Sequence, residues 1–127
     1  MSELSGDSGG TAHGLTAYAD AADDNTLPAL DRTMISVAEW IAATAGTFLG
    51  HVKMAVTTGP RTMTLNLTDL DTGVEHHGSL ISGERVSIRF MAAVLDVDRS
   101  ELAEVMNERL ISNGFKIKNK SMIIELG

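Results

Sequence analysis

The hydrophobic period of the chain changes at His51, and this change limits the folds that the chain can adopt. Before it, apolar residues in 30–48 recur in steps of three and four, which places them on one face of a helix. After it, every second residue is apolar in 52–56 and again in 63–67, with a Thr-Gly-Pro sequence between the two runs. Alternation of this kind is typical of strands with one buried face. The sequence therefore predicts a long helix and then an antiparallel hairpin whose apolar face the helix covers.

The long helix is expected at 27–49. Thr26 is a candidate N-cap, and Gly50 is a natural residue just beyond the C-terminus. Small residues make the second half of this helix smooth, so another backbone can approach it closely, either from the sheet or from a second subunit. A tryptophan beside them is either an interface anchor or an amphipathic residue at the edge of the core. The candidate interface residues are Trp40, Ala42, Ala43, Ala45 and Gly46.

The segments around this helix carry weaker signals. Residues 1–14 are rich in Ser and Gly and are expected to form a flexible tail, and 15–25 have the spacing of a short helix. A third strand at 74–80 would complete a meander with the predicted hairpin. We expect one α+β domain at 15–127, with a helix-and-meander half at 15–81 and a second half at 82–127.

The second half contains a segment that fits both periods. In 85–95 apolar residues alternate as in a strand, yet positions 88, 91, 92 and 95 also follow the helical rule. A helix is predicted at 98–112, since Asp98 and Glu101 are spaced as a capping box, and a tight hairpin is predicted at 115–126. If 85–95 is a strand, the fold is a single mixed sheet with helices on one face.

If 87–95 is a helix, the segment 84–126, about a third of the chain, resembles a winged helix-turn-helix domain. The helix at 98–112 would be its third helix and 115–126 its wing. The turn carries Asp96 where such motifs often have Gly, and the first of the usual three helices has to come from outside the segment. The resemblance implies DNA binding through phosphate contacts from Arg85, Arg89, Arg99, Lys116, Lys118 and Lys120.

The charge of the chain is distributed unevenly along the sequence. With 17 acidic and 10 basic residues the formal net charge is -7, which argues against a surface that attracts nucleic acid as a whole. Residues 1–84 carry three basic and eleven acidic residues, whereas residues from 85 onward carry seven basic and six acidic ones. A local cationic hairpin is therefore compatible with an acidic protein. Lysines at such an edge also deter aggregation, which is the favoured interpretation of the run.

The sequence excludes several kinds of site and contains no recognisable motif for several others. Cysteine is absent, which excludes disulfides, thiolate nucleophiles and Cys-ligated metals. No nucleophile elbow or glycine-rich phosphate loop is found, so we expect no catalytic residue and no cofactor. His51, His76 and His77 are weak candidates for metal ligands, but adjacent strand residues point to opposite faces. No export signal or membrane-spanning apolar run is present, and the expected compartment is the cytoplasm.

These observations leave two main functional hypotheses. The favoured one is a small, acidic, non-enzymatic regulatory or adaptor domain that acts through protein–protein association, with a homodimer through the helix at 27–49 as one form. The alternative is a winged-helix DNA-binding transcriptional regulator that uses the cationic C-terminal hairpin. The conformation of 85–95 separates them, because a strand there removes the winged-helix arrangement.

Overall fold

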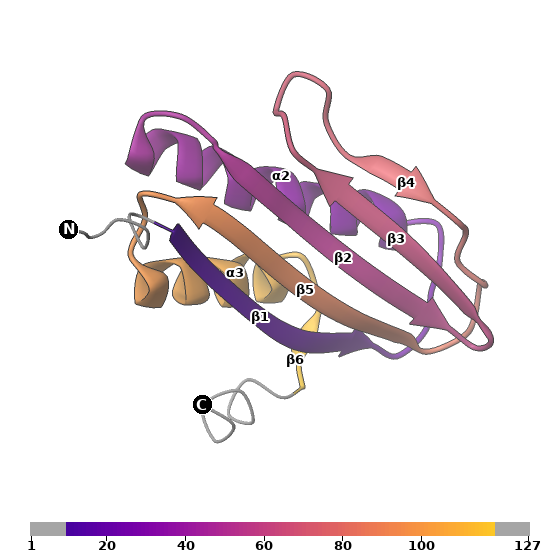
Figure 1. The fold of residues 1–127 in the computed structure, drawn as a ribbon. Coiled ribbons are helices and arrows are strands. Elements are labelled where there is room, and N and C mark those ends of the chain that lie inside the picture. Colours follow the sequence, from indigo (N-terminus) through magenta and orange to yellow (C-terminus); the bar gives the residue numbers. More distant parts are fainter. Residues whose placement is uncertain (1–9, 119–127) are drawn as a thin grey trace.

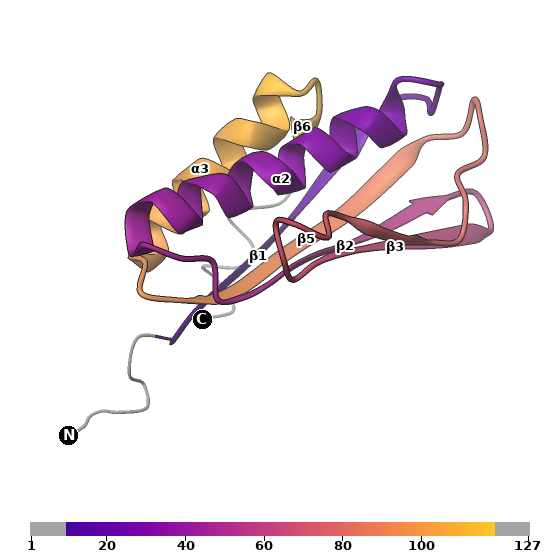
Figure 2. The same cartoon turned by 90° about the horizontal axis from the view of Figure 1, so that it is seen from above.

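In the computed structural model, which describes residues 10–118, two helices lie on one face of a six-stranded antiparallel sheet (Figures 1 and 2). This arrangement confirms the α+β class. The strand order in the sheet is β4-β3-β2-β5-β1-β6. The strands are β1 (Gly10–Ala19), β2 (Gly50–Thr58), β3 (Arg61–Leu67), β4 (Glu75–His77), β5 (Val86–Leu95) and β6 (Lys116–Ile117), and the helices are α2 (Thr26–Ala45) and α3 (Arg99–Ser112).

The core lies between the sheet and the two helices. Strands β2, β3 and β5 bury every second residue on this side, as the alternation predicts for β2 and β3. Phe90 is the largest fully buried side chain, and the rest of the core is mainly aliphatic or methionine. The helical side of the core is formed by Leu30, Met34, Val37 and Ile41 of α2 and by Leu102, Met106 and Leu110 of α3.

The hairpin predicted from the alternation is present, and its register is regular. Val52 pairs with Leu67 at one end of β2 and β3, and Thr58 pairs with Arg61 beside the turn. The predicted third strand is shorter than 74–80, because only β4 pairs with β3 there. The helix stripe in 30–41 also faces the core as predicted.

The N-terminal segment forms a strand, which corrects the prediction of a tail to residue 14 and a short helix after it. Strand β1 pairs with β5 over its whole length, from Gly10 opposite Leu95 to Ala19 opposite Val86. The side chains on its uncovered face are mostly small, so the sequence shows little alternation of polar and apolar residues. The backbone hydrogen bonds to β5 therefore decide the conformation, and local propensity does not.

Helix α2 ends four residues earlier than the predicted limit of 49. Gly46 has φ +93° and its N–H donates to the Ala42 carbonyl, which closes the helix. The N-cap is Asn25, one residue before the predicted one. Gly50 begins β2 with φ +130°, where a Cβ would lie 2.1 Å from the carbonyl oxygen of Ala93. A glycine is therefore required at this close approach of β2 to β5.

Residues 86–95 form the strand β5, so the second helix of the winged helix-turn-helix prediction is wrong. Strand β5 lies between β1 and β2 and pairs with both along its length. Its buried positions recur with a period of two, from Val86 to Val94. Two flanking strands supply backbone partners that a helix in this position could not use. A single sheet with both helices on one face is thus the arrangement adopted, with every strand pair antiparallel.

The start of α3 confirms the predicted cap. The Asp98 carboxylate accepts a hydrogen bond from the Glu101 N–H at 3.0 Å and one from the Ser100 hydroxyl at 2.6 Å. These bonds stabilise the ionised form and hold the pKa of Asp98 below its ordinary value. The Glu101 N–H is one of the helix donors that has no partner within the helix, and Asp98 satisfies it.

The chain after α3 pairs with β1. Strand β6 places Ile117 opposite Ala17 and Lys116 opposite Tyr18. The turn and the second strand of the hairpin predicted at 115–126 lie outside the described residues. Neither helix in the described range is long and apolar enough to cross a bilayer.

Candidate functional site

The sheet has a second face that neither helix of the described residues covers, and we call it the open face (Figure 2). Residues directly opposite each other in antiparallel strands point to the same side, so the strand registers define its members. The open face consists of Gly10, Ala12, Gly14, Thr16 and Tyr18 of β1, His51, Lys53, Ala55 and Thr57 of β2, Thr62, Thr64 and Asn66 of β3, Glu75 and His77 of β4, and Ser87, Arg89, Met91, Ala93 and Leu95 of β5.

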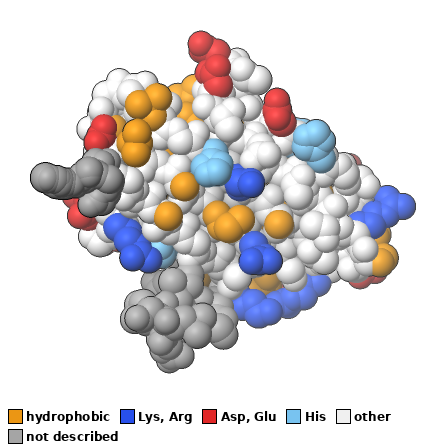
Figure 3. Space-filling view, in the orientation of Figure 1, with side chains coloured by type: hydrophobic (Ala, Val, Ile, Leu, Met, Phe, Trp, Pro, Cys, Tyr) orange, Lys and Arg blue, Asp and Glu red, His pale blue; other side chains and the backbone are white. Residues whose placement is uncertain are grey.

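Exposed apolar side chains gather on this face. Leu49, just before β2, is 50% exposed, while Met91 and Leu95 of β5 are 39% and 40% exposed. They are three of the four large apolar side chains that are exposed in the described residues. Met91 lies in register with Gly14, whose missing side chain leaves the thioether open to solvent. Figure 3 looks onto this face and shows hydrophobic atoms near its centre.

Two adjoining hollows mark the end of the open face near residues 91–95. The larger, with a volume of about 500 Å³, is lined by Ala12, His13, Gly14, His51, Lys53, Met91, Ala92, Ala93 and Arg99. The smaller, of about 450 Å³, is lined by Gly10, Thr11, Ala12, Leu49, Gly50, Ala93, Val94 and Leu95. Ala12 and Ala93 line both hollows, and their small side chains are in register across β1 and β5. The hollows therefore form one continuous shallow depression.

The charge of the open face is opposite in sign to that of the whole chain. Lys53 and Arg89 are exposed on it near the apolar residues, and its one acidic member, Glu75, lies on the edge strand β4. Figure 3 shows Lys, Arg and His side chains beside the central hydrophobic atoms, with acidic side chains toward the upper and left margins. Since the formal net charge is -7, the acidic groups lie mainly elsewhere, for example at Glu39 on α2 and Glu104 on α3.

His13 and Arg99 extend the depression around the edge of the sheet. His13 belongs to β1 but points to the opposite side from Ala12 and Gly14, toward the start of α3. Burial lowers the pKa of His13, and the positive charge of Arg99 lowers it further. The imidazole is therefore mainly neutral at pH 7, and Arg99 supplies the positive charge at this side of the depression.

A second cationic group lies at the other end of β1. The Arg85 guanidinium carbon is 4.0 Å from the centroid of the Tyr18 ring, and the Lys116 Nζ is 5.7 Å from the same centroid. Lys116 also approaches Asp20, with 3.6 Å between Nζ and Oδ2. The Tyr18 ring thus brings together two cationic residues that are distant in sequence.

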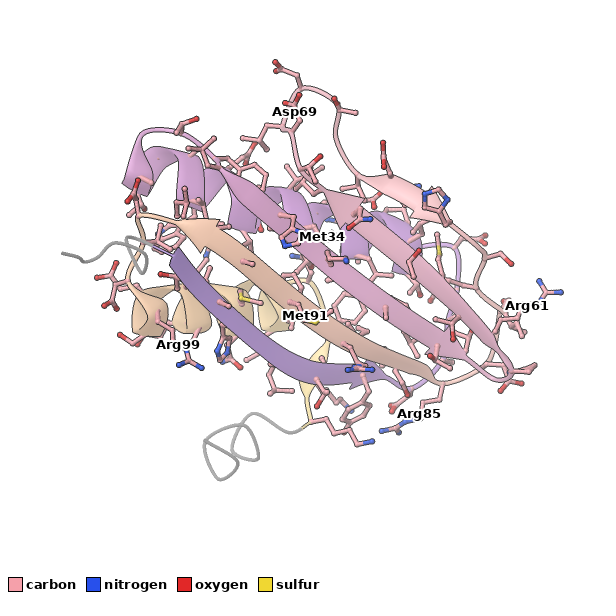
Figure 4. The ribbon with its side chains drawn as sticks, in the orientation of Figure 1. Met34, Arg61, Asp69, Arg85, Met91 and Arg99 are labelled. Carbon is pink, nitrogen blue, oxygen red and sulfur yellow. The ribbon has the colours of Figure 1, made fainter. Side chains whose placement is uncertain are left out.

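The residues predicted to contact DNA do not form a single surface. Figure 4 shows Arg99 and Arg85 toward opposite ends of β1, with Met91 between them on the open face. Lys118 uses its backbone N–H to donate to the Thr16 carbonyl at 2.9 Å. Arg89 lies on the open face, Lys116 lies at Tyr18, and Lys120 is outside the described residues.

The residues of the predicted interface on α2 differ in their exposure to solvent. Trp40 is half-buried and packs against the core, and Ala42 and Ala45 are half-buried as well. Ala43 and Gly46 are exposed, and Gly46 forms the C-cap. A close approach of a second subunit at this end of α2 stays a prediction.

The three histidines considered as metal ligands are separated. His51 lies on the open face, whereas His76 turns toward α2, with its Nε2 atom 2.7 Å from Asp31 Oδ1. His77 pairs with Thr64 and shares the open face side of the sheet. Within residues 10–118 no group of three side chains of the metal-binding types comes together.

Sequence reasoning missed the open face as a site. Its members form no sequence motif, and its exposure depends on which side of the sheet the helices cover. One signal was present, because the non-core positions of β5 include Met91 and Leu95 where a solvent-facing strand usually carries polar residues. Comparisons of the chain with protein-family models, with curated proteins and with solved structures gave no match.

Proposed function

We propose that the chain is a small, non-enzymatic protein-association domain of the regulatory or adaptor type, and that it binds its partner through the open face. The observation that carries this proposal is the combination of exposed Leu49, Met91 and Leu95 with nearby cationic side chains on an uncovered sheet. Apolar patches with a polar margin are typical of protein-binding surfaces, since burying them on association is favourable.

The charges support a partner of a particular kind. Lys53 and Arg89 flank the apolar centre, and the one carboxylate on the open face, Glu75, lies on the edge strand β4, two strands away from β2. A partner surface with acidic side chains around an apolar core would complement this arrangement and associate faster at low salt. A second copy of the chain, placed face to face, would instead bring like charges together.

The lining of the larger hollow favours binding over catalysis. Its nine lining residues include no carboxylate and no hydroxyl or thiol nucleophile. Its titratable members are two histidines, Lys53 and Arg99, and they have no acidic partner in that lining. General acid–base catalysis needs a proton donor and a proton acceptor that are positioned within hydrogen-bonding reach of the reacting groups. The arrangement therefore supports recognition of an anionic partner.

The test uses a labelled synthetic peptide in which glutamate alternates with valine, and a counterpart in which lysine replaces glutamate. Fluorescence anisotropy with the full chain measures both affinities at low and at moderate salt. The glutamate peptide is expected to bind, more weakly as salt rises, and the lysine peptide is not.

The double variant Lys53→Glu, Arg89→Glu reverses the charge beside the apolar centre of the open face. It should weaken binding of the glutamate peptide by about tenfold or more. The matched control, Arg61→Glu with Arg109→Glu, changes the net charge equally but lies off the open face; Figure 4 places Arg61 at the β2–β3 turn. Equal loss in both double variants, or no binding of the glutamate peptide at low salt, would contradict the proposal.

A further inference from the structure

We propose that the partner segment binds as an added antiparallel strand on the free edge of β1, and that it is an extended segment in which large apolar side chains alternate with acidic ones. This inference rests on the proposed function, because it specifies how the open face is used and by which kind of segment. Such strand addition combines main-chain hydrogen bonds with side-chain pockets at alternate positions.

The free edge is the part of β1 that no strand in the described range covers. Strand β6 pairs with β1 only at Ala17 and Tyr18, and the Lys118 N–H then donates to the Thr16 carbonyl. Along an antiparallel strand the residues alternate in the direction of their backbone groups. Since Thr16 directs its carbonyl outward, Gly14, Ala12 and Gly10 also direct their N–H and C=O groups outward. A row of backbone donors and acceptors is thus available to another strand.

The sequence of this edge lacks the features that usually prevent pairing. Edge strands are commonly protected by lysine, proline, a bulge or a very short length. Residues 10–16 contain no proline and no Lys, Arg, Asp or Glu. Strand β1 pairs with β5 in a continuous register over ten residues, so no bulge turns the edge away. The edge is therefore free of bulges, uncharged and long enough to accept a strand of about five residues.

The larger hollow extends around this same edge. Ala12 and Gly14 line it from the open face, whereas His13 and Arg99 line it from the side of the helices. A cavity that reaches both sides of an edge strand leaves room for side chains on both faces of an added strand. The smaller hollow continues this space past Ala12 toward Gly10 and Leu95. The shape thus fits a strand that runs along β1 from the end of β6.

The two sides of the hollow specify the chemistry of the added strand. On the open face its side chains would lie beside Gly14 and Ala12, which leave space up to Met91 and Ala93. Large apolar side chains would fill that space. On the other side they would lie near Arg99, where a carboxylate would find a positive charge. Alternation of apolar and acidic residues matches these two environments.

The first experiment separates backbone pairing from simple contact with the face. The valine–glutamate peptide is prepared with N-methyl groups either on the valine amides or on the glutamate amides, and each form is titrated against the full chain. Valines that face the open side lie opposite the outward-facing residues of β1, so their N–H groups donate to β1. Methylation of the valines should lower affinity about tenfold or more, while methylation of the glutamates should change it about twofold or less.

The outcomes distinguish this inference from the proposed function. If the unmodified peptide binds and Lys53→Glu, Arg89→Glu weakens it, but the two methylated forms bind equally, strand addition is wrong and the open face still binds the partner. If the unmodified peptide does not bind at all, the proposed function itself fails.

The second experiment changes the protein. Ala12→Pro removes one outward N–H without removing a hydrogen bond to β5, and proline is tolerated at such edge positions. This variant should keep its melting temperature within a few degrees and lose about tenfold in peptide affinity. Wild-type affinity in a folded Ala12→Pro variant would contradict strand addition. Should Ala12→Pro fail to fold, the methylated peptides still decide the question.

Two other occupants of the edge are tested in the same system. Ile123→Ser with Ile124→Ser, made in the full chain, should leave peptide affinity unchanged. A rise of about tenfold would show that the chain's own C-terminal segment competes for the edge, and would overturn the proposal. Self-association that Ala12→Pro abolishes would assign the edge to a second copy and would overturn it as well.

Discussion

The close approach of β2 to β5 at Gly50 leads to a quantitative prediction for Gly50→Ala. A Cβ at this position would lie 2.1 Å from the Ala93 carbonyl oxygen and 2.8 Å from the Val94 Cα. Both atoms belong to the backbone of the central strand, so neither can move aside without shifting β5. The φ angle of +130° adds strain for any residue with a side chain.

The magnitude follows from these two contributions. Backbone strain of this kind costs about 1–3 kcal/mol, and forcing an extra methyl group into packed structure costs about 1–3 kcal/mol more. Restriction of the unfolded chain offsets roughly 0.5 kcal/mol. We therefore expect a loss of about 1.5–5.5 kcal/mol in the free energy of unfolding. For a chain of this size the melting temperature should fall by roughly 5–20 °C.

The assay is urea and thermal unfolding followed by circular dichroism, with Gly46→Ala as the matched control. Gly46 also has positive φ, +93°, but a Cβ there would meet nothing within 4 Å. Gly46→Ala therefore introduces the backbone strain without the contact, and it should lower the free energy of unfolding by only about 1 kcal/mol. If Gly50→Ala is no less stable than Gly46→Ala, the contact with β5 does not constrain the sheet, and the predicted steric cost is wrong.

Three further predictions test the core, the pH dependence and the oligomeric state. Met106→Ala should destabilise the fold by about 2–5 kcal/mol because Met106 is fully buried, whereas Met91→Ala on the open face should cost less than about 1 kcal/mol; chemical denaturation measures both. The pKa of His13 in the folded state is lowered from 6.5, so the unfolded state binds the proton more readily and stability should decrease as the pH falls below 6.5. Urea unfolding at about pH 5 and about pH 7.5 should show this decrease in the wild type, a smaller one in Arg99→Gln and none from this source in His13→Gln. If α2 forms a homodimer interface, sedimentation at high concentration should show a dimer that Ala43→Glu dissociates. A wild-type chain that sediments as a monomer would exclude that interface.

The parts of the fold that could be predicted are those whose local pattern and tertiary role agree. Strands β2 and β3 alternate clearly and are joined by a short turn, and α3 begins at the cap formed by Asp98. Residues 86–95 fit two periods, and only the presence of strands on both sides decides between them. Strand β1 was missed because glycine and alanine at its open-face positions give no alternation, and its partner is distant in sequence.

The candidate site could not be predicted from the sequence for a different reason. The open face is defined by the absence of a covering helix among the described residues, which is a property of the assembled layers. The cationic residues grouped by their proximity in sequence do not include Lys53, which lies on the open face with Arg89 although the two are distant in sequence. Met91 and Leu95 carried the only local sign of a binding surface, namely apolar residues at solvent-facing positions.

The position of β5 in the middle of the sheet also determines the order in which the protein can fold. Within residues 10–118, strand β1 pairs directly only with β5 and the short β6, both of which follow it by more than sixty residues in the sequence. A nascent chain that ends before Val86 contains α2 and the β2–β3 hairpin but lacks the strand that joins them to β1. Because pairing between distant segments is slow, the uncharged edge of β1 stays exposed during this interval. The interval is when the chain is most open to pairing with a neighbouring nascent chain.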